Sequence, residues 1–300
     1  MNEPLSSIII CNYNYAAFLG SCIESALAQS YKNVEIIVVD DGSTDSSLQV
    51  IASFGDRITA ISQRNGGQAS AFNAGGRVAH GEIVSLLDSD DLFYPDKVAK
   101  VVDTFVANPA IDWCFHSLYV SPPGDVTDPY LEAHGGLPSG FNDMRSMVSR
   151  GRFPYLMPPT SGMSFRRRLL DKLLPMPEYI RITADNYLKM SAAALATGWF
   201  LPENLALQRI HGNNQYTLKQ DKALIGAVYA WTALALIQTM PCAGRLARRL
   251  LSRALACSWR HSLVATKGGQ QLGEALRAIS LPRLIEVTGA AVLRSALGRY

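Results

Sequence analysis

Three carboxylates crowd into one short turn of the sequence. The stretch LLDSDDLFYPDK, residues 86 to 97, places Asp88, Asp90 and Asp91 directly behind the apolar run IVSLL. Asp and Ser are ordinary turn residues, because their short side chains accept hydrogen bonds from backbone N–H groups. Three like charges within four residues repel one another, and a cation or specific donors usually relieve that repulsion. The turn is therefore a candidate ligand site.

The spacing Asp88-Ser89-Asp90 suits a hard divalent cation, whose remaining ligands would be water and diphosphate oxygens. Such a cation would neutralise charge on a departing nucleoside diphosphate. His211, which precedes Gly212, could supply one more ligand to an ion such as manganese. An isolated histidine is more often a core or surface residue, so both interpretations stay open here.

Polar residues also follow two earlier β-rich runs. Asn12 and Asn14 come after the first run, and Asp40 and Asp41 lie in the second, within VVDDGSTD. A carboxylate in that place can accept a hydrogen bond from a nucleobase N–H, but a buried aspartate that organises the turn would have the same sequence. We assign Asp41 to the ligand and Asp40 to the structure of the turn.

The Gly-rich segment RNGGQASAFNAGG, residues 64–76, fits neither GxGxxG nor a P-loop, which excludes the usual dinucleotide and ATP interpretations. Its backbone N–H groups, including that of Gly67, can still face a phosphate or a sugar hydroxyl near a helix N-terminus. Taken alone, Asn65 is more simply interpreted as a helix N-cap and Asn73 as a helix-packing residue.

Asp185 stands at the start of the helical segment ADNYLKMSAAALATG, residues 184–198. The helix dipole stabilises a carboxylate in that position whatever its role. A catalytic base that deprotonates a sugar hydroxyl would suit the same position. Local sequence does not separate the cap from the base.

Four short β-rich runs, at 7–11, 34–40, 57–62 and 82–88, are separated by stretches long enough for crossover helices. This alternation predicts an α/β fold with a mostly parallel sheet covered by helices on both faces. Ligands of such sheets bind beyond the carboxyl ends of the strands, where the polar residues above are expected.

The remainder divides into three parts. Residues 109–183 carry many prolines and predict irregular structure, which could face a substrate. Residues 205–214, LALQRIHGNN, predict a short strand, and everything beyond 216 predicts helices. We therefore expect one domain over 1–216 and a helical C-terminal region over 217–300.

Composition limits the class of protein. The chain has 300 residues, 48% of them hydrophobic, so it can bury a substantial core. Its five cysteines form no CxxC pair, which favours reduced thiols in the cytoplasm over a disulfide framework or a zinc site. The first residues lack a basic signal-peptide region. Residues 223–240 are uncharged, at the lower limit for a membrane span, and we favour a packed or interfacial helix.

Taken together, these segments resemble family 2 glycosyltransferases with the GT-A fold, a Rossmann-like α/β architecture. The resemblance rests on SIIICNYNYAAFLGSCIESALAQSYKNVEIIVVDDGSTD, RNGGQASAFNAGG, GEIVSLLDSDDLFYPDK, ADNYL and LQRIHGNN, and covers roughly residues 5 to 216. It implies an inverting transferase that moves a sugar from a nucleoside-diphosphate sugar, UDP-linked by expectation, to a hydroxyl of a glycan or lipid-linked acceptor in cell-surface polysaccharide biosynthesis.

The resemblance also implies roles for particular residues. Asp185 would be the catalytic base, and Asp90 and His211 would hold Mn²⁺ or Mg²⁺. The remaining candidates would bind the nucleotide sugar: Asn12, Asn14, Asp41, Asn65, Gly67, Asn73, Asp88 and Ser89. The sequence departs from the family at Cys11-Asn12, where Pro-Thr or Pro-Cys is common, at Phe72, where arginine is common, and at Ala184, where an acidic residue is common.

The tail lies outside the resemblance and is basic. Residues 241–300 contain ten Lys or Arg against two Asp or Glu, and their arginines alternate with leucines in a helical pattern. Such a pattern suits peripheral contact with anionic lipid on the inner face of the cytoplasmic membrane, and equally a helical bundle or a homo-oligomer contact. No nucleic-acid partner is expected.

The sequence argues against two other functions. A sugar nucleotidylyltransferase would need a Gly-rich phosphate loop with a basic residue near the N-terminus, which the sequence lacks. A noncatalytic nucleotide-sugar-binding subunit would be expected to lose Asp185 or the pair Asp88 and Asp90, and all three are present.

Overall fold

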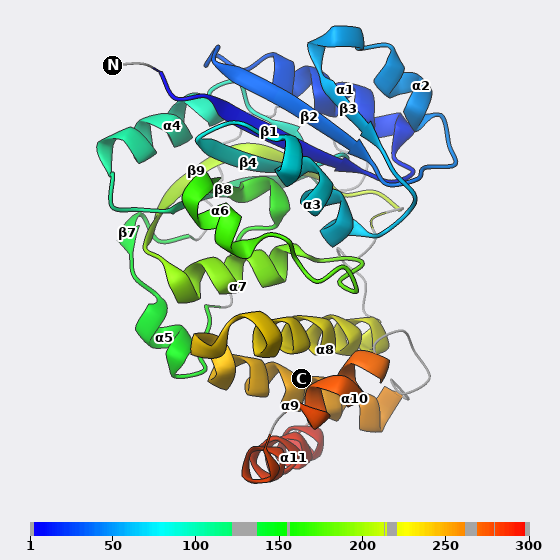
Figure 1. The fold of residues 1–300 in the computed structure, drawn as a ribbon, viewed down its shortest axis with the longest axis vertical. Coiled ribbons are helices and arrows are strands. Elements are labelled where there is room, and N and C mark those ends of the chain that lie inside the picture. Colours follow the sequence, from blue (N-terminus) through cyan, green and yellow to red (C-terminus); the bar gives the residue numbers. More distant parts are fainter. Residues whose placement is uncertain are drawn as a thin grey trace. The chain divides into compact units, whose positions relative to one another are not determined.

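A computed structural model of the chain describes residues 3–121, 137–154, 157–212, 214, 221–261, 269–278 and 280–297. The chain forms two compact units (Figure 1). The first comprises 1–143, 155–181 and 196–214, and the second comprises 144–154, 182–195 and 215–300. The sequence suggests one boundary at 216, whereas the second unit also takes two earlier segments.

One mixed β-sheet forms the centre of the first unit. Within the described residues it has nine strands: β1 (Ser6–Asn12), β2 (Val34–Asp40), β3 (Thr59–Ser62), β4 (Ile83–Asp88), β5 (Leu92–Phe93), β6 (Trp113–Ser121), β7 (Gly140–Asn142), β8 (Met163–Arg166) and β9 (Gly198–Arg209). Their order is β3-β2-β1-β4-β8-β6-β9-β5, and β7 pairs with β9. The first four strands are parallel, as the sequence predicts, while β5, β7 and β8 run antiparallel to their neighbours.

The register of the parallel strands aligns their polar ends. Asn12 of β1 lies opposite Asp40 of β2, and Cys11 lies opposite Asp88 of β4. Because parallel strands end at the same edge of a sheet, the polar residues after β1, β2 and β4 share that edge. The α/β class inferred from the sequence is confirmed, and so is the expected arrangement of strand ends.

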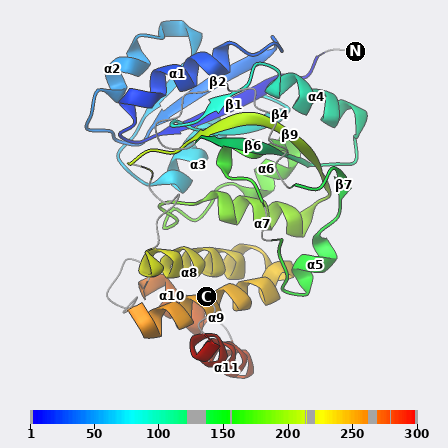
Figure 2. The ribbon, with the colours of Figure 1, turned by 180° about the vertical axis from the view of Figure 1, so that it is seen from behind.

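Helices cover both faces of this sheet (Figures 1 and 2). On one face lie α1 (Ala16–Leu27), α2 (Ser47–Ala52) and α4 (Lys97–Ala107), whose apolar side chains pack on Ile8, Val38 and Leu87. On the other lie α3 (Gln68–Val78) and α6 (Arg167–Leu173). A Cβ at Gly75 of α3 would lie 2.5 Å from Cγ2 of Ile9, so the glycine lets α3 approach β1 closely.

Two expectations about the middle of the chain need correction. The segment 109–183 is not simply irregular, since it contains β6, β7, β8, α6 and the short α5 (Arg145–Ser149). The strand expected at 205–214 begins earlier, at Gly198, and ends at Arg209. Gly198 is close to the Trp113 ring, which leaves no room for a side chain at the first residue of β9.

The second unit is helical in its described residues. Besides α5 it contains α7 (Asp185–Leu195), α8 (Lys222–Thr239), α9 (Gly244–His261), α10 (Gly269–Arg277) and α11 (Leu281–Leu297). Short 3-10 turns occur at Gly55–Arg57 and Thr160–Gly162 in the first unit and at Pro241–Ala243 in the second.

The helix α8 is the one described helix long and apolar enough to cross a membrane, with a mean hydropathy of 1.2 over its 18 residues. Its residues from Gly226 to Leu236 are mostly buried around the whole helix circumference, with 56% of the window buried inside the structure. The side chain of Asp221 caps its N-terminus by accepting from the backbone N–H groups of Ala223 and Leu224. This burial suits the packed helix that the sequence favours.

Candidate functional site

The two predicted metal ligands of the first unit lie side by side. Oδ2 of Asp90 is 3.1 Å from Nε2 of His211, and each side chain is only 13% exposed. Asn214 donates its Nδ2–H to the same carboxylate oxygen at 3.0 Å and accepts from the backbone N–H of His211. Residues from β9 and the loop after it therefore converge on the turn that follows β4.

An arginine holds this pair against the first helix. The guanidinium of Arg209 donates to the backbone oxygen of Asp90 and to Oγ of Ser21, and it lies 5.0 Å from the ring centroid of Phe18. The His211 ring stacks on Phe18 with centroids 4.2 Å apart. Burial lowers the pKa of Arg209, and the charges of Asp91 and Asp90 act against that shift. The imidazole is thus held in one orientation by stacking.

The other two carboxylates of the turn have different environments. Asp91 is 2% exposed and accepts from Ser161 Oγ at 2.6 Å and from the backbone N–H of Arg209 at 3.2 Å. Burial, with the neighbouring charges of Asp90 and Asp88, raises its pKa well above the usual range. Asp88 is half-buried and accepts from Nε2 of Gln68 at 3.0 Å. Asp91 therefore braces the turn, while Asp88 keeps an accessible side chain.

Asn12 and Asp40 form a buried pair at the ends of β1 and β2. Nδ2 of Asn12 donates to Oδ1 of Asp40 at 2.8 Å and to Oγ of Ser43 at 3.1 Å. The other oxygen of Asp40 accepts from the backbone N–H of Ser43. Oδ1 of Asn12 is buried and accepts no hydrogen bond from any residue that the structure describes. Asp40 organises the turn, and Asn12 retains one oxygen for a further donor.

Asp41 is placed at the Gly-rich segment. It is 3% exposed and accepts from the backbone N–H groups of Gly66 at 2.8 Å and Gly67 at 2.7 Å, and from Nε2 of Gln63. Gly67 has a φ of +89°, and a Cβ there would lie 2.7 Å from the Cα of Arg181. The backbone at Gly67 therefore has a left-handed conformation and lies close to a second backbone segment. Both features favour glycine at this position.

Three further candidates interact mainly with the protein. Asn14 accepts from the backbone N–H of Thr44 at 2.7 Å, and Asn65 accepts from the guanidinium of Arg181. Asn73 is 2% exposed and uses its amide on the backbone N–H and C=O of Met176. Their contact with a donor stays a prediction, and Asn73 has the helix-packing environment that the sequence offers as the simpler interpretation.

Whether the turn suits a divalent cation depends on its donor atoms. Among the described residues, no group of three or more His, Cys, Asp and Glu side chains surrounds one point. Asp90 and His211, whose Oδ2 and Nε2 atoms are 3.1 Å apart, would be the protein ligands of such an ion. The hydroxyl of Ser89 is buried without a hydrogen-bond partner among those residues. A carboxylate and an imidazole are donor types that a divalent ion accepts, and the role of this pair as a metal site stays a prediction.

Asp185 belongs to the second unit. It is the first residue of α7, 9% exposed, and its Oδ2 lies 2.7 Å from Nζ of Lys189, one helical turn later. Thr183, just before the helix, has a φ of +53°. The carboxylate is therefore at a helix N-terminus, as the sequence predicts, and an i,i+4 ion pair fixes its orientation.

Sequence reasoning missed several residues that shape these environments: Gln68, Ser161, Arg209, Asn214 and Lys189. Arg209 and Asn214 lie within LQRIHGNN, and Gln68 lies within the Gly-rich segment, so their segments carried a signal although the residues themselves did not. Ser161 comes from a part of the chain expected to be irregular. Lys189 follows Asp185 at the i,i+4 spacing, which is itself a readable signal.

Comparison with known sequences identifies a family. The family model described as "Glycosyl transferase family 2" matches residues 7–174. An uncharacterised glycosyltransferase of Nostoc sp. is 40% identical over 215 residues, 70% of this chain and 66% of the relative. One from Rickettsia typhi is 44% identical over 132 residues, 40% of this chain. The chain spans 66% and 42% of the lengths of these two relatives.

Solved structures share the fold. The S. aureus protein TarS, residues 1–349, in complex with UDP-GlcNAc, has a TM-score of 0.66 at 14% identity, over 99% of this chain and 93% of that one. The mannosyltransferase PcManGT from Pyrobaculum calidifontis, in complex with GDP-Man and Mn²⁺, has a TM-score of 0.51 at 17% identity, over 100% of this chain and 89% of that one. The GT-A architecture expected from the sequence is thereby confirmed.

Proposed function

Since the chain belongs to glycosyl transferase family 2, we propose that it is an inverting enzyme that transfers a sugar from a nucleoside-diphosphate sugar, UDP-linked by preference, to a hydroxyl of a glycan or lipid-linked acceptor. The observation that carries the proposal is the polar edge of the sheet in the first unit. Carboxylates after β2 and β4 share it with a histidine that follows β9. Synthesis of a cell-surface polysaccharide would use such a transfer.

Binding of the nucleotide falls to the residues after β1 and β2. Asp41 would accept from the base, and Asn12, whose Oδ1 is buried without a donor among the described residues, would line the same pocket. Asp88 would face the ribose or the donor sugar, with Gln68 at 3.0 Å orienting its carboxylate. The side-chain oxygens of both Asp41 and Asn12 can accept a hydrogen bond from a nucleobase N–H.

Asp90 and His211 would hold a divalent cation, Mn²⁺ or Mg²⁺. When bound, the ion would neutralise the negative charge that develops on the departing diphosphate. The two residues prepare this site before any donor arrives, because stacking on Phe18 fixes the imidazole and Asn214 fixes the carboxylate. The complex of PcManGT contains Mn²⁺ with GDP-Man, which supports an ion of this class for the present chain.

Asp185 would act as the general base. Its role is to take the proton from the acceptor hydroxyl as that oxygen attacks the anomeric carbon, so the new glycosidic bond forms on the face opposite the leaving diphosphate. Lys189 orients the carboxylate through Oδ2. Attack from the opposite face inverts the anomeric configuration in a single displacement.

The substitution Asp185→Asn tests the base assignment. We expect transfer, measured as nucleoside diphosphate released in the presence of acceptor, to fall by about 10²- to 10⁴-fold, the usual contribution of a positioned base. Nucleotide binding, measured by calorimetry, should stay nearly unchanged because the amide keeps the size of the side chain.

The matched control is Asp221→Asn, the same change at the N-cap of α8 in the same unit. Asparagine is an equally good cap, so turnover and stability should remain close to those of the unmodified chain. Full turnover in Asp185→Asn would show that another group accepts the proton.

A further inference from the structure

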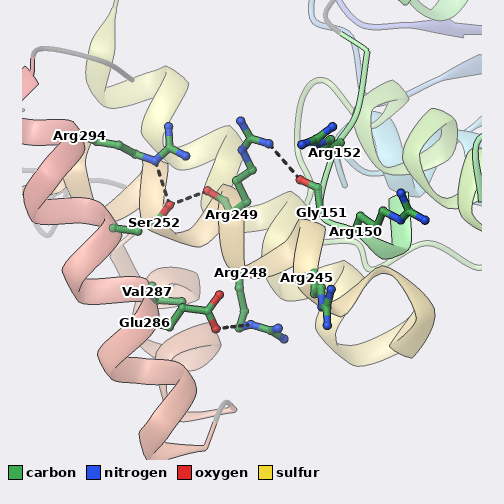
Figure 3. Close-up of a pocket in the computed structure, with 11 residues that line it drawn as sticks. Arg150, Gly151, Arg152, Arg245, Arg248, Arg249, Ser252, Glu286, Val287 and Arg294 are labelled. Atoms are coloured by element: carbon green, nitrogen blue, oxygen red, sulfur yellow. Dashed lines mark hydrogen bonds and ion pairs between the residues drawn. The ribbon is translucent and has the colours of Figure 1, made fainter. Parts of the chain in front are cut away.

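The second unit contains a pocket of about 500 Å³ between α9, α11 and the loop that follows α5 (Figure 3). Eleven described residues line it, and six of them are arginines: Arg150, Arg152, Arg245, Arg248, Arg249 and Arg294. Glu286 is the one acidic residue among the eleven. The pocket therefore collects far more positive than negative charge.

Helical spacing explains how the arginines gather. Arg245, Arg248, Arg249 and Ser252 recur at the i, i+3, i+4 and i+7 positions of α9, so they share one face. Leu246 and Leu250, on another face, are buried. The basic amphipathic pattern predicted from the sequence thus corresponds to α9, whose charged face forms one wall of the pocket.

Short-range contacts hold three guanidinium groups around the pocket. Arg248 Nε lies 3.3 Å from a carboxylate oxygen of Glu286, Arg249 Nη1 donates to the backbone oxygen of Gly151 at 3.3 Å, and Arg294 Nε donates to Ser252 Oγ at 3.2 Å (Figure 3). Burial lowers the pKa of Arg294, and the charges of Arg253 and Arg249 lower it further. The guanidinium of Arg294 is therefore partly buried close to another positive charge, that of Arg249.

The contacts above engage three of the six arginines, so ties between helices account for only part of the cluster. Arginines that only tie helices together are usually matched by carboxylates, because unmatched like charges at close range raise the free energy of the folded state. One carboxylate can neutralise one of the six. The planar guanidinium fork matches the oxygens of a phosphate in paired hydrogen bonds.

We propose that this pocket binds a phosphoryl-bearing ligand with at least two negative charges, separate from the nucleotide-sugar donor. The volume of the pocket lies within the range of small-molecule sites, which begins at about 300 Å³. It is larger than a single phosphate requires, so a diphosphate, or a phosphate with an attached group, would fit. The source is a soluble diphosphate or the headgroup of a lipid. Leu293 of α11, the neighbour of the pocket residue Arg294, is 66% exposed, which would give a lipid an apolar contact.

The test is calorimetric titration of inorganic pyrophosphate into the full chain, in low salt with a chelator so that the donor site lacks its cation. The pocket variant is Arg245→Gln with Arg249→Gln, both exposed positions. The control is Arg277→Gln with Arg283→Gln, which removes the same charge from exposed positions of α10 and α11 outside the pocket. A second variant, Arg150→Gln with Arg152→Gln, removes charge from the loop should the first fail to fold.

A second arm measures co-sedimentation of the same variants with vesicles of phosphatidylcholine, with and without phosphatidic acid. We expect the pocket variant to bind pyrophosphate or phosphatidic-acid vesicles at least about tenfold more weakly than the unmodified chain, with the control little changed. Pyrophosphate binding without vesicle binding would identify a soluble source, and vesicle binding that the pocket variant weakens would identify a lipid headgroup. Equal weakening in pocket variant and control, or no binding in either arm, would overturn the proposal.

Discussion

The three carboxylates of the turn, Asp88, Asp90 and Asp91, have different environments and therefore different roles. Asp91 is buried and accepts from Ser161 and from the backbone of Arg209, so it holds the turn together. Asp90 faces His211, and Asp88 faces Gln68. The sequence alone indicates that a cation or specific hydrogen-bond donors must relieve the repulsion among the three carboxylates. Their separate partners come from α3, from the segment before β8, and from β9 and the loop after it, which no local pattern connects to the turn.

Two neighbouring substitutions test this division. Asp90→Asn should weaken manganese-dependent binding of UDP by about 10- to 100-fold, because an amide is a poor replacement for a carboxylate ligand. Asp91→Asn should change it by less than about threefold, since an asparagine can accept from the Arg209 N–H and donate to Ser161 Oγ.

Calorimetry with manganese and with a chelator measures both effects. The two variants make the same chemical change one residue apart, so each serves as the control for the other. Equal losses in both variants would contradict separate roles for the two carboxylates.

At the scale of elements, the β-strands and helices of the first hundred residues follow from hydrophobic periodicity. The runs expected at 7–11, 34–40, 57–62 and 82–88 appear as β1, β2, β3 and β4 with small shifts at their ends. The apolar runs of β1, β2 and β4 are clear because these strands are mostly buried on both faces, whereas β3, at the edge of the sheet, is largely exposed. Periodicity does not predict β8, a four-residue strand that pairs antiparallel with both β4 and β6 across long sequence separations.

Lys97 shows why the local sequence was insufficient within α4. The sequence identifies the apolar stripe of this helix, yet Lys97 itself is fully buried, 3.0 Å from Oγ of Ser164 and 4.2 Å from the ring centroid of Phe93. Burial lowers its pKa to about 7. A lysine after Pro-Asp reads as a solvent-exposed residue until β8 is placed beside it.

The buried lysine predicts a pH-dependent stability. Between about pH 7 and pH 10 the unfolded chain binds a proton at Lys97 that the folded chain does not, so folding becomes more favourable as the pH rises. Relative to Lys97→Met, the free energy of unfolding of the unmodified chain should rise by about 1.4 kcal/mol per pH unit in this window, and level off below it.

Urea unfolding at pH 7.5 and pH 9.5 measures the change. The control is Lys100→Met on the same helix, where a 45% exposed side chain should give the same difference at both pH values. A difference for Lys97→Met that does not depend on pH would mean that this amine titrates normally in the fold.

At the scale of the whole molecule, the chain combines a GT-A unit with a helical unit, of which the family model covers only residues 144–154. The sequence predicts both parts. It does not predict that 144–154 and 182–195 belong to the helical unit, because membership there depends on contacts of α5 and α7 with distant helices. From the sequence, the tail is predicted to form an amphipathic surface. The arginine pocket could not be predicted, because its residues come from α9, α11 and the loop after α5 and meet only in the folded chain.

The central claim is that the chain binds a nucleoside-diphosphate sugar with the help of a divalent cation. A thermal-shift screen of nucleotide sugars, each with manganese and with a chelator, tests it most directly, because ligand that binds only the folded chain raises its melting temperature. We predict that at least one nucleotide sugar, expected to be a UDP-sugar, raises the melting temperature in the presence of manganese. With the chelator, the same donor should raise it much less. No stabilisation by any donor under either condition would contradict the account.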